Sequence, residues 1–140
     1  MMIINHSAVP STLDLLMGAY RAHVHRRTLP TPVLVAFHPN EAQVEVQLGG
    51  APDLPHVLAD VLLWTTTLAE VTAEWTHARE ARLLVTVRGR SASGVRFLAY
   101  GGGPFADCLG LVQLRPGERE GVSLDELYAL LNLIREREAA

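Results

Sequence analysis

The spacing of hydrophobic residues along this chain switches repeatedly between the period of a helix and the alternation of a strand. Helical spacing, with an apolar residue at every third or fourth position, occurs in three segments: 11–27, 53–69 and 123–138. Patterns typical of strands occur in five other segments: 33–37, 44–48, 71–76, 83–90 and 95–101. The order α-ββ-α-βββ-α predicts an α+β domain with a mostly antiparallel sheet of five or six strands.

Length and composition predict one globular domain over residues 1–140. Apolar residues make up 49% of the chain and charged residues 19%, which is enough for a core and argues against disorder. The single cysteine, Cys108, excludes an intrachain disulfide, and no apolar run approaches the roughly 18 residues of a membrane span. The start of the chain lacks the features of a signal peptide, so we expect a cytoplasmic protein.

Three capping signals predict where the helices begin. Ser11 with Asp14, and Ser123 with Glu126, have the spacing of a capping box, in which each side chain bonds the backbone of the other residue. Asp53 precedes the second helical segment and has the side chain of a good N-cap. We therefore expect Ser11, Asp53 and Ser123 to begin the three helices.

Turn residues predict the register of two hairpins. A four-residue loop at 39–42 sets three apolar pairs on one face: Phe37 with Val44, Val35 with Val46, and Val33 with Leu48. In the second hairpin, Ala92-Ser93-Gly94 is a three-residue loop with glycine at the left-handed position. That register places Arg90 opposite Arg96, with Arg88 on the same outer face.

The segment between the second hairpin and the last helix is predicted to be mostly loop. The run Gly101-Gly102-Gly103-Pro104 is interpreted as a flexible strand exit, because it fits neither a dinucleotide fingerprint nor a P-loop and the chain has no lysine. Residues 109–114 are a candidate for a short edge strand, and residues 116–121 are predicted to form a solvated turn.

No residue group has the spacing of a catalytic or metal site. The chain has six histidines, interpreted as surface residues: His6, His23, His25, His38, His56 and His77. His23 and His25 point about 200° apart on a helix, so they cannot share a metal. Cys108 has no base beside it in sequence, so we expect a small buried hydrophobe, and we expect no metal or cofactor.

Three arginines form the candidate partner-binding or anion-binding site. In the predicted register Arg88, Arg90 and Arg96 share one outer face, where like charges repel one another without a counter-charge. One interpretation is a solvated face screened by salt and nearby glutamates. The other is a contact surface for an acidic protein partner or a phosphate backbone.

The last helix carries the candidate self-association surface. Its apolar residues cover an arc of about 160°, more than the roughly 100° needed to cover one sheet face. Surplus apolar surface on a helix flank indicates a partner. We therefore expect a homodimer held by four residues of this helix: Leu127, Leu130, Leu133 and Ile134.

Five stretches between residues 57 and 131 carry a resemblance: Leu62-Leu63-Trp64, Leu68-Ala69-Glu70-Val71-Thr72-Ala73-Glu74-Trp75, Val85-Thr86-Val87-Arg88-Gly89-Arg90, Tyr100-Gly101-Gly102 and Gly121-Val122-Ser123-Leu124-Asp125-Glu126-Leu127. They resemble small actinobacterial proteins, some from phage-like or mobile elements, a group that implies no activity and no catalytic residues. Twelve arginines and no lysine fit a GC-rich source of that kind. The predicted element order is also similar to that of the Roadblock/LC7 family, which implies a dimeric scaffold.

These observations favour a non-enzymatic interaction or regulatory module that self-associates. One alternative is a nucleic-acid accessory protein that binds through surface arginines. Another is a small ligand-binding domain or an enzyme without a recognisable catalytic motif. The net charge of −3 gives no support to general polyanion binding, so a nucleic-acid partner is not favoured, and we expect no membrane partner.

Overall fold

The computed structural model describes residues 8–49 and 53–140. Within them are three helices: α1 (Ala8–Val24), α2 (Leu54–Thr65) and α3 (Leu124–Ala139). The strands are β1 (Leu34–His38), β2 (Gln43–Gln47), β3 (Ala69–Ala78), β4 (Arg82–Arg90), β5 (Arg96–Pro104) and β6 (Arg119–Val122), and a short 3-10 helix, η1 (Phe105–Cys108), follows β5. None of these helices is both long and apolar enough to cross a membrane.

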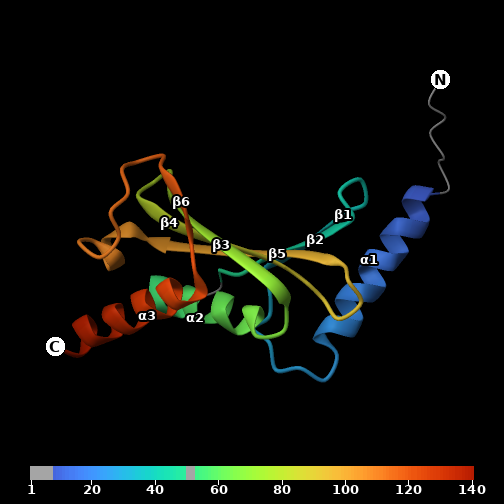
Figure 1. Ribbon diagram of the computed structural model, residues 1–140, viewed down its shortest axis with the longest axis horizontal. Coiled ribbons are helices and arrows are strands. Elements are labelled where there is room, and N and C mark those ends of the chain that lie inside the picture. Colours follow the sequence, from blue (N-terminus) through green and yellow to red (C-terminus); the bar gives the residue numbers. More distant parts are fainter. Residues whose placement is uncertain (1–7, 50–52) are drawn as a thin grey trace.

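All these strands belong to one sheet, in the order β1-β2-β5-β4-β3-β6 (Figure 1). Neighbouring strands are antiparallel except β2 and β5, which run parallel. A parallel pair needs a long connection, and the chain between β2 and β5 contains α2, β3 and β4. The predicted α+β domain with a mostly antiparallel sheet is confirmed.

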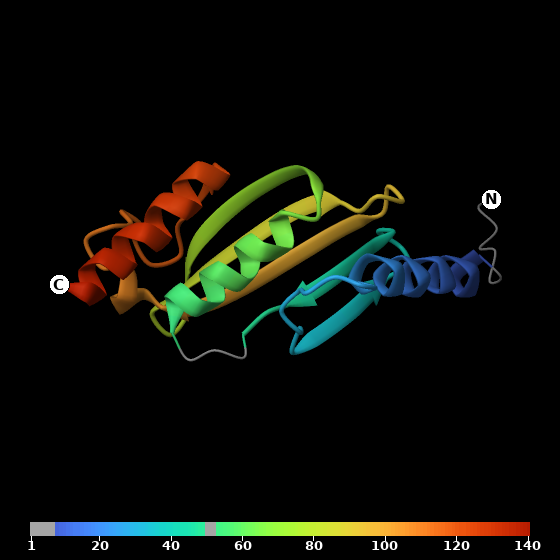
Figure 2. The ribbon, with the colours of Figure 1, turned by 90° about the horizontal axis from the view of Figure 1, so that it is seen from below.

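The helices of the described residues lie on one face of the sheet. We call this face, which the helices cover, the inner face. Figures 1 and 2 show α2 and α3 side by side against it, with α1 at the end near β1 and β2. His23 of α1 contacts the rings of both Trp64 of α2 and Phe97 of β5, which places α1 on the same side as α2. The core therefore lies between the inner face and the helices, and Trp64 and Phe97 are among its largest buried side chains.

The predicted register of both hairpins is confirmed at their centres. The first ladder contains two of the three predicted pairs, Phe37 with Val44 and Val35 with Val46. Val33 lies just before β1, and its N–H donates to the carbonyl of Gln47 at 2.9 Å. In the second hairpin Arg90 pairs with Arg96, and Gly94 has the expected left-handed backbone (φ +84°).

Two of the three predicted N-caps are confirmed. The Asp53 carboxylate accepts the backbone N–H of His56, and Ser123 forms the capping box at the start of α3. The prediction for Ser11 is wrong, because α1 begins at Ala8 and Ser11 lies inside the helix. Pro10 does not prevent this earlier start, since proline is tolerated in the first turn of a helix.

The predicted extension of α2 to residue 69 is wrong, because the helix ends at Thr65. Thr65, Thr66 and Thr67 each donate a side-chain hydrogen bond to the carbonyl three residues earlier. Hydroxyls that bond the last carbonyls in this way compete with continuation of the helix, and β-branched residues favour a strand. Consequently β3 begins four residues after the end of α2.

The glycine run after the second hairpin belongs to β5, so its prediction as a loop is wrong. Residues 101–104 pair with β4 to the end of the strand. A Cβ atom at Gly101 would lie 2.5 Å from the carbonyl oxygen of Leu48, and one at Gly103 would lie 2.6 Å from the Cα of Leu54. The glycines are required because neighbouring backbone approaches the strand this closely.

The edge strand next to β3 is β6. Residues 109–114 form no strand, so the prediction of an edge strand there is wrong. That segment forms turns and extended chain, with Gly110 at φ +82°. Of the predicted solvated turn at 116–121, residues 116–117 form an exposed turn, and residues 119–121 belong to β6. The indole N–H of Trp75 donates to the Glu120 carboxylate at 2.9 Å, which helps to hold this polar strand against β3.

Candidate functional site

The face of the sheet that points away from the helices is here called the outer face, and it lies uppermost in Figure 1. Side chains alternate across a sheet, so the inner-facing Val87 and Ala99 are followed on their strands by outer-facing Arg88 and Tyr100. No helix of residues 8–49 and 53–140 covers the outer face. The face is therefore available to a partner.

Charge is distributed unevenly between the outer face and the rest of the molecule. The strands place on it five arginines and three glutamates: Arg82, Arg88, Arg90, Arg96, Arg119, Glu45, Glu70 and Glu74. The outer face thus has a net charge of +2 on a chain whose net charge is −3, which leaves −5 for the other residues. A basic face on an acidic protein attracts an acidic partner and orients it.

Arg88, Arg90 and Arg96 share the outer face as predicted, and the nearby glutamates of the screened-face interpretation lie beside two of them. Arg88 lies 3.3 Å from the Glu74 carboxylate, and Arg90 lies 3.4 Å from that of Glu70. Both glutamates come from β3, the neighbour of β4. Two of the three arginines are thus partly neutralised within the chain.

Arg96 differs from the other two arginines. No carboxylate of the described residues lies within 4.0 Å of its guanidinium, although it faces Arg90 directly across the β4–β5 ladder. Arg88, Arg90 and Arg96 together line an open hollow of about 330 Å³, and Gln43, Thr72 and the Glu70 carboxylate that pairs with Arg90 also line it. The hollow offers cationic and neutral hydrogen-bond donors to a carboxylate or a phosphate.

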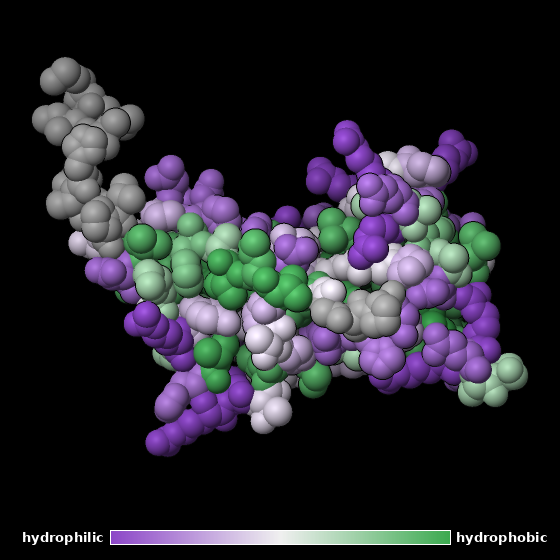
Figure 3. Space-filling model, turned by 180° about the vertical axis from the view of Figure 1, so that it is seen from behind, coloured by the Kyte–Doolittle hydropathy of each residue, from purple (hydrophilic) through white to green (hydrophobic). Residues whose placement is uncertain are grey.

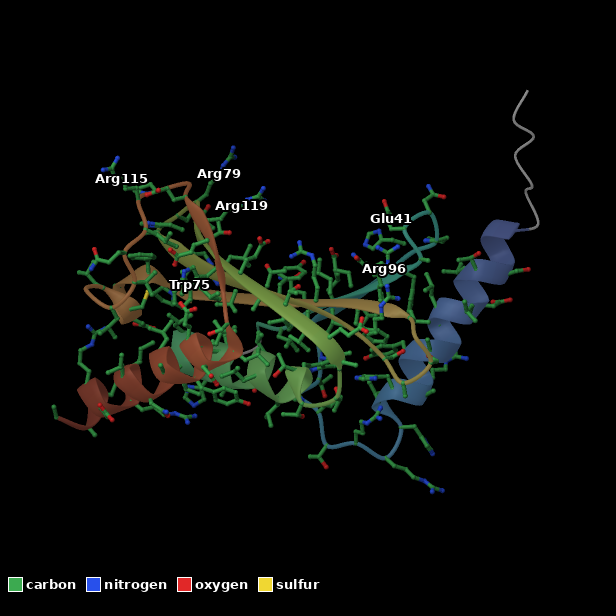
Figure 4. The ribbon with its side chains drawn as sticks, viewed as in Figure 1. Glu41, Trp75, Arg79, Arg96, Arg115 and Arg119 are labelled. Carbon is green, nitrogen blue, oxygen red and sulfur yellow. The ribbon has the colours of Figure 1, made fainter. Side chains whose placement is uncertain are left out.

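A second group of arginines lies at the far end of the same side. Figure 4 shows Arg79, Arg115 and Arg119 spread over this end of the molecule, all pointing away from the helices, with Arg96 toward the other end of the sheet. They come from the turn after β3, the loop before β6, and β6 itself. Within the described part of the chain none of them forms an ion pair.

An uncharged strip separates these two groups of arginines. It is formed by four residues of β4 and β5: Leu84, Thr86, Leu98 and Tyr100. The hydroxyl of Tyr100 donates to the amide oxygen of Gln47 at 3.3 Å. The pKa of Tyr100 is raised, first by its partial burial and second by the negative charge of Glu45. The hydroxyl therefore stays protonated at neutral pH and can donate a hydrogen bond.

The residues predicted for self-association are mostly part of the core. Leu127, Leu130 and Ile134 are buried, because α3 packs against both α2 and η1. The apolar arc of α3 therefore serves several neighbours within the chain, and its interpretation as surplus is wrong. Leu133 is the one predicted residue that remains substantially exposed, at 46%.

His23 is the clearest site that the sequence interpretation missed. It is 3% exposed and lies between the rings of Trp64 and Phe97, so its prediction as a surface residue is wrong. Its position three and four residues beyond Tyr20 and Ala19 continues the buried side of α1. That spacing indicates a buried position for His23. The nearby arginines in the sequence instead favoured its interpretation as an exposed residue.

The remaining candidates for catalysis or metal binding are the thiol of Cys108 and the possible metal-ligating side chains. Burial and then the neighbouring Asp107 raise the pKa of the Cys108 thiol to about 11, and the thiol donates to the carbonyl of Phe105. Across residues 8–49 and 53–140, no three metal-ligating side chains are grouped to hold an ion. His6 lies outside the described residues.

Comparison with known protein families, curated proteins and solved structures finds no match. The resemblances to small actinobacterial proteins and to Roadblock/LC7 scaffolds therefore stay predictions.

Proposed function

We propose that this protein is a non-enzymatic binding module whose outer face takes an acidic segment of a protein partner. The observation that carries the proposal is Arg96, an exposed cation without a carboxylate within 4.0 Å among the described residues, beside a hollow that two further arginines line. A carboxylate placed there would complete the alternation of charge that Glu74 and Glu70 begin.

The uncharged strip favours a protein segment over a nucleic acid. Leu84, Leu98 and Tyr100 offer apolar area that protein side chains can cover. A phosphate backbone instead gains affinity from a continuous run of free cations, and Arg88 and Arg90 are already paired with glutamates. Tyr100, a single stacking ring on the outer face of β4 and β5, is also less than a typical single-strand binding platform supplies.

The test measures binding by fluorescence anisotropy to three labelled probes. These are a glutamate-rich peptide with leucine and phenylalanine interspersed, a lysine-rich peptide of the same design, and a single-stranded oligonucleotide. We expect the wild-type protein to bind the glutamate-rich peptide, with an affinity that falls as salt rises. Arg96→Gln should weaken this binding about fivefold, since one exposed ion pair contributes about 1 kcal/mol.

Arg135→Gln is the matched control, because Arg135 is an exposed arginine on α3, away from the outer face. We expect it to leave the affinity unchanged. Tighter binding of the oligonucleotide than of the acidic peptide would favour the nucleic-acid alternative. Equal loss of affinity in both variants, or no binding of the acidic peptide at low salt, would contradict the proposal.

A further inference from the structure

The two edges of the sheet differ in how they are protected against pairing with another strand. The edge at β6 is four residues long and contains Arg119, Glu120 and Gly121, which are residues that discourage strand addition. The edge at β1 has the sequence Leu-Val-Ala-Phe-His, without proline and without a permanent charge. β1 is therefore an edge strand that lacks the usual protection.

Exposed apolar side chains surround this unprotected edge. Val33 is 55% exposed and Leu34 is 46% exposed at the start of β1, and Leu15 is 61% exposed on α1, which packs beside β1. Figure 3 looks onto the side of the molecule where β1 lies and shows hydrophobic residues gathered over that end. Such a patch beside free backbone donors and acceptors marks an interaction surface.

We propose that β1 pairs antiparallel with β1 of a second copy, so that the two sheets join into one across a twofold axis. With the axis at Ala36, Leu34 of one protomer lies opposite His38 of its partner, and Val35 lies opposite Phe37. These pairs bring no like charges together, and an aromatic residue opposite a β-branched one is a favourable cross-strand pair. At the axis the two Ala36 side chains lie side by side on one face of the joined sheet, where two methyl groups fit without a clash.

The area required also points to a contact larger than a single strand. A five-residue strand is about 17 Å long, and backbone pairing alone covers less than the roughly 1,200 Å² that a stable dimer buries. Val33 and Leu34, next to the strand, and Leu15 on α1 supply further apolar area. This dimer leaves the outer face of both copies uncovered, so it is independent of the proposed function.

The chain offers a matched pair of variants for the test. Leu34 and Leu133 are both leucines that are 46% exposed, one on β1 and one on α3. Leu34→Lys places a positive charge on the edge strand, where natural proteins use lysine to prevent pairing with another strand. Leu133→Lys places the same charge on α3. Molar mass is measured by light scattering after size exclusion, from about 1 to about 300 μM, a range that spans the dissociation of dimers with micromolar to high-micromolar dissociation constants.

We expect a wild-type dimer, a Leu34→Lys variant whose dissociation constant rises at least about tenfold, and an unchanged dimer for Leu133→Lys. Circular dichroism and thermal melting check that each variant is folded. If Leu34→Lys fails to fold, Val33→Lys, just outside the strand, carries the same charge to the same edge. A wild-type monomer at the highest concentration overturns the proposal. Loss of the dimer in Leu133→Lys alone also overturns it and assigns self-association to α3.

Discussion

The Nε2 atom of His23 on α1 lies 2.8 Å from the hydroxyl oxygen of Thr67, which follows α2. Thr67 donates its one hydroxyl proton to the carbonyl of Trp64, so its oxygen must accept a proton from Nε2. Nε2 therefore carries a proton, and in the neutral ring it is the protonated nitrogen. Its Nδ1 is buried and has no hydrogen-bond partner among the described residues.

This arrangement predicts that stability depends on pH through His23. Burial, and then the charge of Arg27, lower the pKa of His23 from 6.5 to about 4. Between these two values the unfolded chain binds more protons than the folded chain, so stability is lost as pH falls from 6.5 toward 4. The loss from this one group approaches about 3 kcal/mol at the acidic end.

Urea unfolding of wild type and His23→Phe at pH 7, 6, 5 and 4 tests this prediction. Phenylalanine keeps a ring between Trp64 and Phe97 but does not titrate, so its stability relative to wild type should rise as pH falls. His25→Phe is the control, because His25 is exposed on the same segment. An identical pH dependence in all three proteins would show that His23 does not contribute.

A second prediction concerns the glycine run in β5. Gly103→Ala should lower the free energy of unfolding by about 2 kcal/mol or more, because its Cβ would overlap backbone atoms of Leu54 that cannot move independently. Gly121→Ala in β6 is the control, since a Cβ there meets nothing within 4 Å. Its change should stay below about 0.5 kcal/mol in the same urea titration. Equal effects of the two substitutions would contradict this close packing.

Local signals in the sequence predicted the elements and registers that depend on neighbouring residues. The loop length between β4 and β5 and the left-handed Gly94 were enough to place Arg90 opposite Arg96. Capping chemistry likewise located Asp53 and Ser123. In these cases the decisive contacts lie within a few residues along the chain.

The failures involve contacts between distant segments. The glycines of β5 are read as loop unless the approach of Leu48 and α2 is known. β6 has a polar sequence, and its place in the sheet depends on Trp75, 45 residues away from Glu120. The counter-charges of Arg88 and Arg90 come from β3, whose neighbours in the sheet could not be deduced from periodicity. The sequence therefore predicted which arginines share the outer face, but it could not identify Glu74 and Glu70 as their counter-charges.

A third prediction is that Cys108 reacts very slowly in the folded protein. With its pKa raised to about 11 by burial, little thiolate is present at pH 8. We expect the rate of labelling by a thiol reagent to be at least about 100-fold lower than that of an ordinary cysteine. Labelling in the presence of urea should restore the ordinary rate. Fast labelling of the native protein would show an accessible, activated thiol and would reopen the question of chemistry there.

The last prediction tests the charge pattern of the outer face through stability alone. Arg96 faces Arg90 across the ladder, so Arg96→Glu replaces a repulsive pair with an attractive one and should stabilise the fold by about 0.5 kcal/mol at low salt. Arg90→Glu makes the same cross-strand change but also breaks the pair with Glu70 and sets two carboxylates side by side. It should therefore be neutral or destabilising. Both differences should shrink in about 1 M salt, where charges on an exposed face are screened. Equal stability changes for the two variants at low salt would mean that Glu70 does not neutralise Arg90, and that the three arginines form one uniform cationic group.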